Sequence, residues 1–449
     1  MASTSVDHKD IADNIYNTIE ILIVEDGKGR KHDVFSPSIY RVPQTLRNVN
    51  KNSYTPRVVS IGPFHKDIEV LKEAEKHKLS YLSDLFSRVT SSREQAMKAC
   101  LNMLLPKLDQ IKACYAGKME TYDDHKFAKM MVIDGCFILE LIYRSKFNKK
   151  PSTSFFDNNL LLLYVKHDLL LLENQIPYFV LVDIFENTIR KLEPTVSLAN
   201  LVLEFLSDMN PFGKELLLDK DEANTRHDHI LGLLQKCYQH AHDTFTEQLD
   251  PDSGVKFLNA ISYSVTDLAL AGVMFRPNTD EEWLLAMEFK SSTVPLFCCS
   301  WSKPTFKMPF LQIEDYTESV LRNLIAYEQC SPAIPNYVTS YAFAMERILD
   351  TKEDVHKVIS SKVLINNLGS SEQASNMINS ICKEVTVKDF CYTQQWQQME
   401  DYYNGYWPKN VSWLRRTYFN TPWSFIALVA GILLFGLTVA QTYFTIRPI

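Results

Sequence analysis

The sequence predicts a mainly α-helical protein: a large helical domain with a small antiparallel β insertion, followed by a single C-terminal transmembrane helix. Three observations lead to this expectation. Apolar residues recur at helical spacing along much of the chain. Short β-type runs, separated by polar or Pro-containing turns, gather at about residues 257–316. Residues 423–446 are almost wholly apolar.

These observations divide the chain of 449 residues into five segments. We expect a polar, flexible leader at 1–34, an α-rich globular domain at 35–405, a juxtamembrane segment at 406–420, a transmembrane helix at 421–446 and a short tail at 447–449. The hydrophobic share of 46% and the charged share of 22% are those of an ordinary globular domain.

Four segments in the first half are predicted to be helical. Lys66–Val89 and Arg93–Ile111 carry apolar residues on one face, as amphipathic helices do. In the first of these, the apolar face comprises Ile68, Leu71, Ala74, Leu79, Leu82 and Phe86. Met130–Ile142 and Leu160–Phe185 are apolar on nearly every face, so they are predicted to be central, buried helices. Charged residues interrupt both, and neither is expected to span a membrane.

The second half begins with a predicted loop at 207–229, which is rich in Asp, Asn, Pro and Gly. Between 257 and 314, the runs GVMFRP, LLAMEFK and FKMPFLQIED predict a small antiparallel sheet. Helices are predicted to resume at 317 and to continue to about 403. The sequence Asp315–Glu318 predicts a capping box at the start of the first of these helices.

The C-terminal segment has the length and composition of a membrane span. No charged residue lies between Arg416 and Arg447, and a bilayer core about 30 Å thick needs roughly 20 apolar helical residues. Thr421-Pro422 predicts an N-cap followed by proline at the first helical position. Trp423 and Tyr443 fit the aromatic belts at the two membrane interfaces. We therefore predict a C-terminal membrane anchor.

The charges beside the span predict its orientation. Lys409, Arg415 and Arg416 precede it and Arg447 follows it. The positive-inside rule then places the large domain in the cytosol, and we expect the plasma membrane as its location. The N-terminus has no apolar core of seven or more residues, so it does not resemble a secretory signal peptide. Asn410 begins a glycosylation sequon, which would be silent on the cytosolic side.

Composition also bounds the class of partner. A net charge of −7 argues against nucleic acid, because a nucleic-acid-binding protein would present a basic face. The nine cysteines show no paired spacing, and most have apolar neighbours. They are predicted to be buried thiols of a reducing compartment.

Common enzyme signatures are absent: the sequence has no GxSxG, GxxxxGK[ST], HExxH or CxxC motif. The best metal candidate is the pair His227-Asp228-His229 with the pair His240-Ala241-His242. Two HxH pairs could hold zinc or copper, but residues at i and i+2 diverge on a helix. Solvated loop and helix histidines explain the pattern more simply. We predict no metal site and no cofactor.

A second group of polar residues lies in or beside the apolar helices. It comprises Asp134, Glu140, His167, Asp168, Glu173, Asp315, Glu318, Arg322 and Glu328. Buried carboxylates can act as general acid and base. They can equally be partners of Arg322 and of backbone amides in a satisfied polar network. We favour the network, because no nucleophile or metal is evident beside them, and we predict no catalytic residue.

Several of these residues lie in motifs that identify the chain as resembling a plant family, domain of unknown function 247. The matching segments are Ile39–Arg47, Tyr54–His65, Met131–Glu140, Asp168–Phe179, Ser264–Val273 and Ile313–Gln329, in family order. One departure lies at 262–264, where the family usually has Pro-Ser, and Asp267 replaces a Glu. The resemblance implies a C-terminal membrane anchor and no settled catalytic activity. Some relatives are found at grass self-incompatibility loci, where they are thought to serve recognition.

Two functional hypotheses follow. The first is a membrane-tethered interaction or signalling protein whose α-rich domain presents a surface to a protein partner. The alternative is a membrane-associated hydrolase or transferase that uses Asp134, His167, Asp168 and Glu173. Convergence of these four on a concave pocket would favour the enzyme, and their enclosure by helices would favour the interaction protein.

The apolar span also allows self-association. Ala427 and Gly431 lie four residues apart, as do Gly436 and Ala440, so each pair places two small residues on one face. Such spacing lets transmembrane helices approach closely. The two pairs lie on different faces, which weakens the prediction of a homodimer.

Overall fold

The computed structural model describes most of the predicted domain and the predicted span. The described residues are 36–89, 92–117, 119, 122–147, 158–213, 215–218, 226–240, 263–279, 283–291, 303–406, 408–410, 413, 416 and 422–446. The predicted leader at 1–34 and tail at 447–449 lie outside them.

The N-terminal half consists of helices packed around one central helix, α6 (Asp124–Phe147), nearly all of which is buried from Phe127 to Arg144. Helices α3 (Lys72–Arg88), α4 (Arg93–Leu104), α8 (Tyr178–Asn187) and α10 (Leu198–Phe205) pack against α6. The remaining elements are α2 (Gln44–Val49), η1 (Lys51–Tyr54), η2 (Glu69–Leu71), η3 (Leu105–Lys107), α5 (Leu108–Ala113), α7 (Asn159–Asp168), α9 (Ile189–Leu192), η5 (Ser207–Met209) and α11 (Ile230–Lys236).

The C-terminal half is built on α14 (Thr317–Cys330), which is buried along almost its whole length. Helices α11, α15 and α17 pack on it, and so does η1 from the start of the domain. The helices of this half are α13 (Val265–Leu270), α14, α15 (Tyr337–Ile348), α16 (Lys352–Ser360), α17 (Ser371–Ile381) and α18 (Thr393–Tyr403). Because α14 contacts elements from both halves, it joins them in one body.

Two small sheets complete the C-terminal half. Strands β1 (Met274–Pro277), β2 (Glu288–Lys290) and β3 (Thr305–Met308) pair in the order β1-β3-β2, and β4 (Leu311–Ile313) pairs with β5 (Leu364–Asn366). Phe275, Phe306 and Phe289 stand in register across the first sheet, and Phe306 meets the Trp396 ring of α18 at 5.9 Å. This aromatic row holds the sheet against α18.

The expected antiparallel pairing is only partly correct. In the described residues β2 and β3 are antiparallel, whereas β1 with β3 and β4 with β5 are parallel. The run FKMPFLQIED supplies two strands rather than one, because Pro309 has no N–H to donate and interrupts the ladder. Its two halves belong to different sheets.

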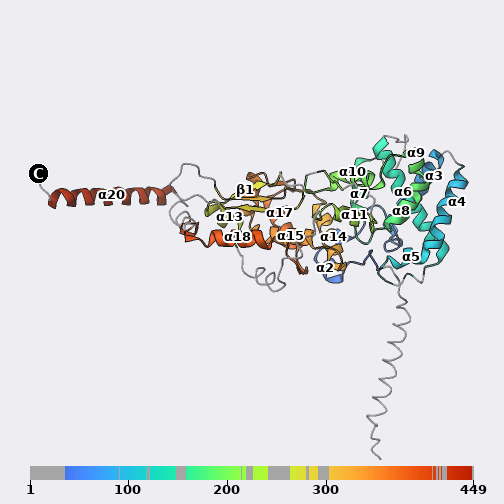
Figure 1. Ribbon diagram of the computed structural model, residues 1–449, viewed down its shortest axis with the longest axis horizontal. Coiled ribbons are helices and arrows are strands. Elements are labelled where there is room, and N and C mark those ends of the chain that lie inside the picture. The colour runs from blue at the N-terminus through green and yellow to red at the C-terminus, as the bar shows by residue number, and fades with distance from the viewer. Residues whose placement is uncertain are drawn as a thin grey trace, which may run out of the picture.

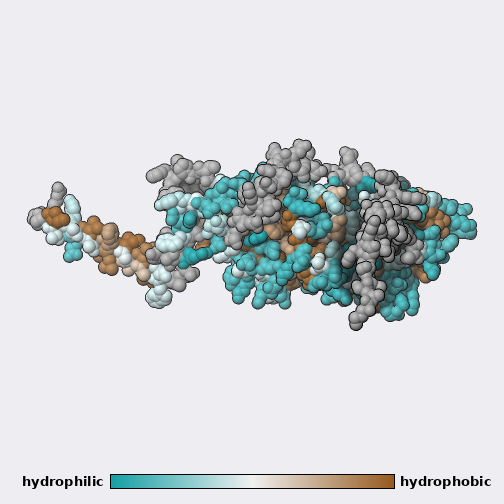
Figure 2. All heavy atoms as spheres, turned by 90° about the horizontal axis from the view of Figure 1, so that it is seen from below, coloured by the Kyte–Doolittle hydropathy of each residue, from teal (hydrophilic) through white to brown (hydrophobic). Residues whose placement is uncertain are grey.

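Figure 1 shows a body extended along one axis. Helices α3, α4, α6 and α9 lie at one end, α14 lies near the middle, and α13, β1 and α18 lie at the other end. Figure 2 shows a mainly hydrophilic surface over the body and a row of hydrophobic side chains along the C-terminal helix.

That C-terminal helix is α20 (Pro422–Ile446), and it matches the predicted span. Residues Trp423–Ile446 are long and apolar enough to cross a membrane, and none of their most apolar window is buried against the body. In the part of the chain that the structure describes, α20 is the one helix with these properties.

The mainly α-helical fold class is confirmed, but the predicted helix Leu160–Phe185 is two helices. Helix α7 ends at Asp168, residues 169–177 are irregular, and α8 begins at Tyr178. Pro177 disfavours helical geometry at the preceding residue, and the side chain of Gln175 bonds the carbonyls of Leu169 and Leu171 at 2.6 and 2.9 Å. The break therefore has both a steric and a polar cause.

The apolar face predicted for Lys66–Val89 is buried in the structure at Leu71, Ala74, Leu82 and Phe86, and Leu79 is the exception. Leu79 is 51% exposed, whereas its neighbour Lys78 is fully buried. The reason is an ion pair, because the Lys78 ammonium lies 2.6 Å from a carboxylate oxygen of Asp134 on α6.

The capping box predicted at Asp315–Glu318 is wrong. The N-cap of α14 is Tyr316, which makes no side-chain cap bond. Thr317 instead accepts the N–H of Glu314 at 2.9 Å, and Glu318 accepts Arg322 Nε at 2.8 Å. Capping depends on the local backbone, and this turn places the Glu318 side chain toward its own helix.

Gly62 gives a test of how tightly the N-terminal segment fits the body. Its φ is +71°, and a Cβ at this position would lie 2.5 Å from the backbone oxygen of Gln175. We expect Gly62→Ala to lower the free energy of unfolding by about 2 kcal/mol or more, measured by chemical denaturation.

Gly117→Ala is the matched control. Its φ is +129°, but nothing lies within 4 Å of the added Cβ. It should lose only about 1 kcal/mol, from backbone strain. Equal losses in the two variants would show that the close approach at Gly62 contributes nothing.

Candidate functional site

The candidate functional site is a cluster of buried polar side chains where residues 53–66 cross α6, α7 and α14. Between η1 and η2 this segment forms no helix or strand, yet Ser60 and Ile61 are almost fully buried. Buried N–H groups need acceptors, and here side chains supply them. We call this cluster the polar junction.

Asp168, at the end of α7, binds three consecutive backbone amides. Its carboxylate accepts the N–H groups of Arg57, Val58 and Val59 at 2.9, 2.7 and 2.9 Å. Asp168 is fully buried. The carboxylate therefore supplies the hydrogen-bond acceptors that a helix or a neighbouring strand would otherwise supply to these amides.

Asn174 and Asp134 hold the next residues of the segment. The side-chain oxygen of Asn174 accepts the N–H of Ile61 at 2.7 Å, and its amide donates to the carbonyl of Val59 at 3.0 Å. Asp134 accepts the N–H of Gly62 at 2.9 Å. Side chains of the body thus accept the N–H groups of Val59, Ile61 and Gly62.

Lys78 compensates the charge of Asp134. Its ammonium lies 2.6 Å from Asp134 and also contacts Glu75 and the carbonyl of Ser60. Burial nevertheless raises the pKa of Asp134, because the opposing attraction of Lys78 is smaller than the loss of hydration. Lys78 and Asp134 are both 0% exposed, so this ion pair is closed to solvent.

Glu173 joins the start of the domain to the same junction. It accepts the N–H of Val42 at 2.6 Å, lies 2.5 Å from the Arg47 guanidinium, and has His65 Nε2 at 3.2 Å. Burial alone would raise the pKa of this carboxyl, but the groups at His65, Arg47 and Val42 together lower it. Glu173 is therefore a paired carboxylate.

Helix α14 closes the junction from the other side. Asn323 accepts the N–H of Leu172 at 2.9 Å and donates to the carbonyl of Ser53 at 2.7 Å. Ser319, one turn earlier, donates to the same carbonyl at 2.7 Å. One carbonyl of η1 is thereby held by two side chains of α14.

Ser319, His167 and Asp168 form a chain that resembles a catalytic triad. His167 Nδ1 lies 3.1 Å from Asp168, and His167 Nε2 lies 2.8 Å from Ser319 Oγ. In a triad the serine donates its proton to the histidine. Here the one hydroxyl proton of Ser319 goes to the Ser53 carbonyl, and all three side chains are buried. The arrangement is closed and lacks a nucleophile poised for attack.

The other acids of the predicted group have their own partners elsewhere. Glu140 accepts Arg88 Nη2 and Arg144 Nε, both at 2.8 Å. Arg322 was expected to pair with the buried acids of this group. It pairs with Glu318 at 2.8 Å and not with the acids of the polar junction. The predicted group of polar residues is therefore divided among several separate sets of hydrogen bonds and ion pairs.

Glu328 caps the N-terminus of α15, while Asp315 is exposed. Glu328 accepts the N–H groups of Val338 and Thr339 at 3.0 and 2.8 Å, and a bond from Gln235 at 3.2 Å. Burial raises the pKa of Glu328 to about 7, against the opposing effect of these donors. Its role in the structure is to satisfy the first amides of α15.

The predicted histidine pairs form no metal site within the residues described. No group of three or more His, Cys, Asp or Glu residues there could hold a metal ion, and His242 lies outside them. The alternative of solvated histidines is also wrong for His227 and His229, which are 6% and 0% exposed. His229 caps α11 by accepting the N–H of Gly232 at 3.0 Å, and its Nε2 donates to Ser38 at 3.0 Å.

The cysteines follow the sequence prediction where they are described. Cys100, Cys114, Cys136, Cys237, Cys330, Cys382 and Cys391 are free thiols, and five of them are buried. Burial raises the pKa of Cys100 and of Cys114 to about 11. The raised pKa disfavours the reactive thiolate form of these two side chains.

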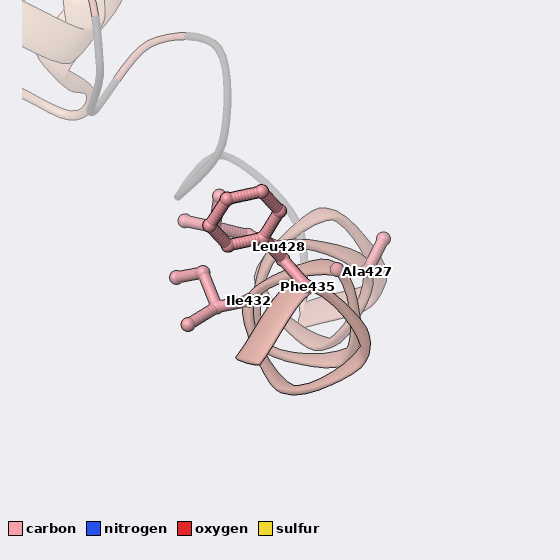
Figure 3. Close-up of a pocket in the computed structure, with 5 residues that line it drawn as sticks. Ala427, Leu428, Ile432 and Phe435 are labelled. Atoms are coloured by element: carbon pink, nitrogen blue, oxygen red, sulfur yellow. The ribbon is translucent and has the colours of Figure 1, made fainter. Parts of the chain in front are cut away.

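Four cavities bounded by described residues lie away from the polar junction. One, of about 290 Å³, lies between the end of α14 and residues 386–391, and an acidic groove of about 700 Å³ lies between α13 and α16. A shallow groove follows α20 beside Gly431. Figure 3 shows Leu428, Ile432 and Phe435 on one side of this helix and Ala427 on another. None of these cavities is lined by Asp134, His167, Asp168 or Glu173.

Sequence reasoning found the acids of the junction but missed most of their partners. The sequence pattern does not single out Lys78, Ser319 or Asn323. Their partners lie far away in sequence: 56 residues separate Lys78 from Asp134, and 270 separate Asn323 from Ser53. A signal was present at Arg47 and His65, since both lie in the segments that carry the family resemblance.

The chain is similar to a family of plant proteins. A model of the family described as "Plant protein of unknown function" matches residues 39–437. The UPF0481 protein At3g47200 of Arabidopsis thaliana is 27% identical over 415 residues, covering 90% of this chain and 85% of that protein. The UPF0481 protein At3g02645 of the same plant is 24% identical, covering 93% and 92%. No solved structure matches the chain.

Glu173 provides the first test of the junction. We expect Glu173→Ala to lower the free energy of unfolding by roughly 1–3 kcal/mol, because it strands the buried amide of Val42 and the cation of Arg47. Glu186→Ala is the control: that carboxyl is 45% exposed and pairs with Arg190 on the same helix. It should change stability by less than about 0.5 kcal/mol. A Glu173 variant that unfolds like the wild type would contradict the structural role.

His229 provides a pH test. Burial lowers its pKa to about 4, so the folded protein binds this proton less readily than the unfolded chain, whose histidine has a pKa near 6.5. Stability from this group is full above the unfolded pKa and is lost as the pH falls toward the folded pKa. The loss should reach about 2 kcal/mol between pH 7.5 and pH 5.

Chemical denaturation at several pH values measures this loss. His229→Asn keeps a capping oxygen for α11 but has no group that titrates in this range. It should be less stable than the wild type at pH 7.5 and should show a smaller fall on acidification. An unchanged pH dependence in the variant would contradict the assignment.

Proposed function

Because this chain belongs to domain of unknown function family 247 of plant proteins, we propose that it is a single-pass membrane-anchored interaction or recognition protein. The domain of residues 35–405 presents a surface to a protein partner, and residues 421–446 hold it at a membrane. The expected family resemblance is confirmed by the family match.

One observation carries the proposal for the domain. The buried acids and His167 of the polar junction are enclosed, and each is bonded to a backbone amide or to another side chain. Removing such partners strands other buried groups, so these side chains serve the fold. What the domain offers to other molecules is therefore its surface.

The alternative is a membrane-associated hydrolase or transferase that uses Asp134, His167, Asp168 and Glu173. It would need these groups to line a cavity that a substrate can enter. The geometry instead gives every one of them a structural partner, so this alternative ranks second.

The anchor is supported by the length and composition of α20. We propose that the domain faces the cytosol, because Lys409, Arg415 and Arg416 precede the span and Arg447 follows it. The plasma membrane is the proposed location. The weak negative charge of the chain favours a protein partner over nucleic acid.

Self-association through α20 remains part of the proposal as a lesser element. The shallow groove at Gly431 gives a second helix room to approach. The Gly436 and Ala440 pair lies on another face, so the contact would be confined to one small-residue pair.

The proposed anchoring is tested by deleting residues 421–449. We expect the shortened protein to remain in the soluble fraction with its unfolding transition intact, because the body has its own buried core. The full chain should resist extraction by alkaline carbonate. A shortened protein that still pellets with membranes after a high-salt wash would contradict the role of α20.

The partner and the orientation are tested on the full chain. Protease added outside sealed vesicles of the plasma membrane with the cytosolic face outward should digest the domain. Affinity purification with the anchor intact should recover a protein partner. Protection of the domain from the protease would overturn the proposed orientation.

A further inference from the structure

The acidic groove lies at the end of the body formed by α13 and α16. Its carboxylates are Asp267, Glu346, Asp350, Glu353 and Asp354, and Arg347 is the basic residue in its wall. In Figure 1, α13 and α18 lie at the end of the body from which the chain continues toward α20.

Two helix capping boxes lie in this groove, and they fix the direction of two of its acids, Asp267 and Asp354. Asp354 caps α16 with Thr351 and also accepts the N–H of Thr266 at 2.7 Å, so it is fully used. Asp267 caps α13 with Ser264 through one carboxylate oxygen. Its other oxygen is directed to a group from outside the groove.

That group is the guanidinium of Arg416, which pairs with Asp267 across 149 residues of sequence. The pair is an observed contact between the groove and the segment that leads into the membrane span. Arg416 is 63% exposed and Asp267 is 23% exposed. One acid of the groove thus already pairs with a basic side chain from the segment before α20.

The length of chain after Arg416 fixes where the groove must lie. Six residues lead from Arg416 to Pro422, the first residue of α20. Six residues span at most about 20 Å when fully extended. With Arg416 in the groove, the α13 and α16 end of the body is therefore held close to the membrane surface.

We infer that the acidic groove is a docking site for the juxtamembrane arginine, and that this contact sets the orientation of the domain on the membrane. The inference rests on the proposed membrane anchor. It makes α13 and α16 the membrane-facing end, and it directs the opposite end, with α3, α4 and α9, toward the partner. Arg416 also separates the acids of the groove from lipid phosphates, which would otherwise repel them.

The full chain in phosphatidylcholine proteoliposomes at low salt provides the test. A donor dye is attached at Lys98→Cys, since Lys98 is exposed on α4 at the far end. Acceptor dyes are placed on lipid headgroups. In the docked orientation the dye lies far from the membrane, so energy transfer is low.

Arg416→Glu should undock the groove, and energy transfer should rise. An exposed ion pair is expected to change the docked-to-undocked ratio by about two- to five-fold, and the reversed charge adds repulsion from the neighbouring acids. Arg416→Lys should stay close to the unsubstituted chain. High salt should raise transfer in the unsubstituted chain toward that of the Glu variant.

Lys409→Glu is the matched control, because it makes the same change of charge in the same segment. Within the described residues, Lys409 makes no ion pair with a groove acid. It should leave energy transfer unchanged. Equal rises in Arg416→Glu and Lys409→Glu would overturn docking in favour of general attraction between basic residues and lipid.

No change in Arg416→Glu would also overturn the inference. Resistance to carbonate extraction is measured on the same samples. Its loss would contradict the proposed anchor itself, whereas intact resistance without a change in energy transfer would contradict only the docking.

Discussion

The fold depends on satisfying a buried stretch of backbone that forms no regular secondary structure. Residues 57–62 cross the body, and five of their six N–H groups donate to the side chains of Asp168, Asn174 and Asp134. A buried N–H left without an acceptor costs about 1–3 kcal/mol. Several such losses would approach the whole stability of a domain. The buried carboxylates of Asp168 and Asp134 and the backbone of residues 57–62 therefore stabilise each other.

This constraint gives a physical meaning to the segments that carry the family resemblance. Ile39–Arg47, Tyr54–His65, Met131–Glu140, Asp168–Phe179 and Ile313–Gln329 are far apart in sequence but supply both sides of the same contacts. Glu173 of one segment binds Val42 and Arg47 of another, and Asn323 of a third segment accepts the N–H of Leu172. The motifs describe one junction, and its chemistry is that of backbone recognition.

The acidic groove lies apart from the polar junction, at the end of the body formed by α13 and α16. At the end formed by α13 and α16, carboxylates exceed basic groups and receive Arg416 from the juxtamembrane segment. Under the proposals above, this ion pair orients the domain relative to the membrane.

The sequence by itself determined the elements whose signal is local. Apolar length identified α20, continuous apolar character identified α6, and periodicity identified the helices from 317 to 403. Tertiary structure decided the break between α7 and α8, the burial of Lys78, the parallel strand pairings and the triad-like contact of Ser319. Periodicity reports how a residue relates to its neighbours within a few turns. The partner of a buried polar group lies wherever the fold brings a matching donor or acceptor, and for Ser53 and Asn323 that is 270 residues away.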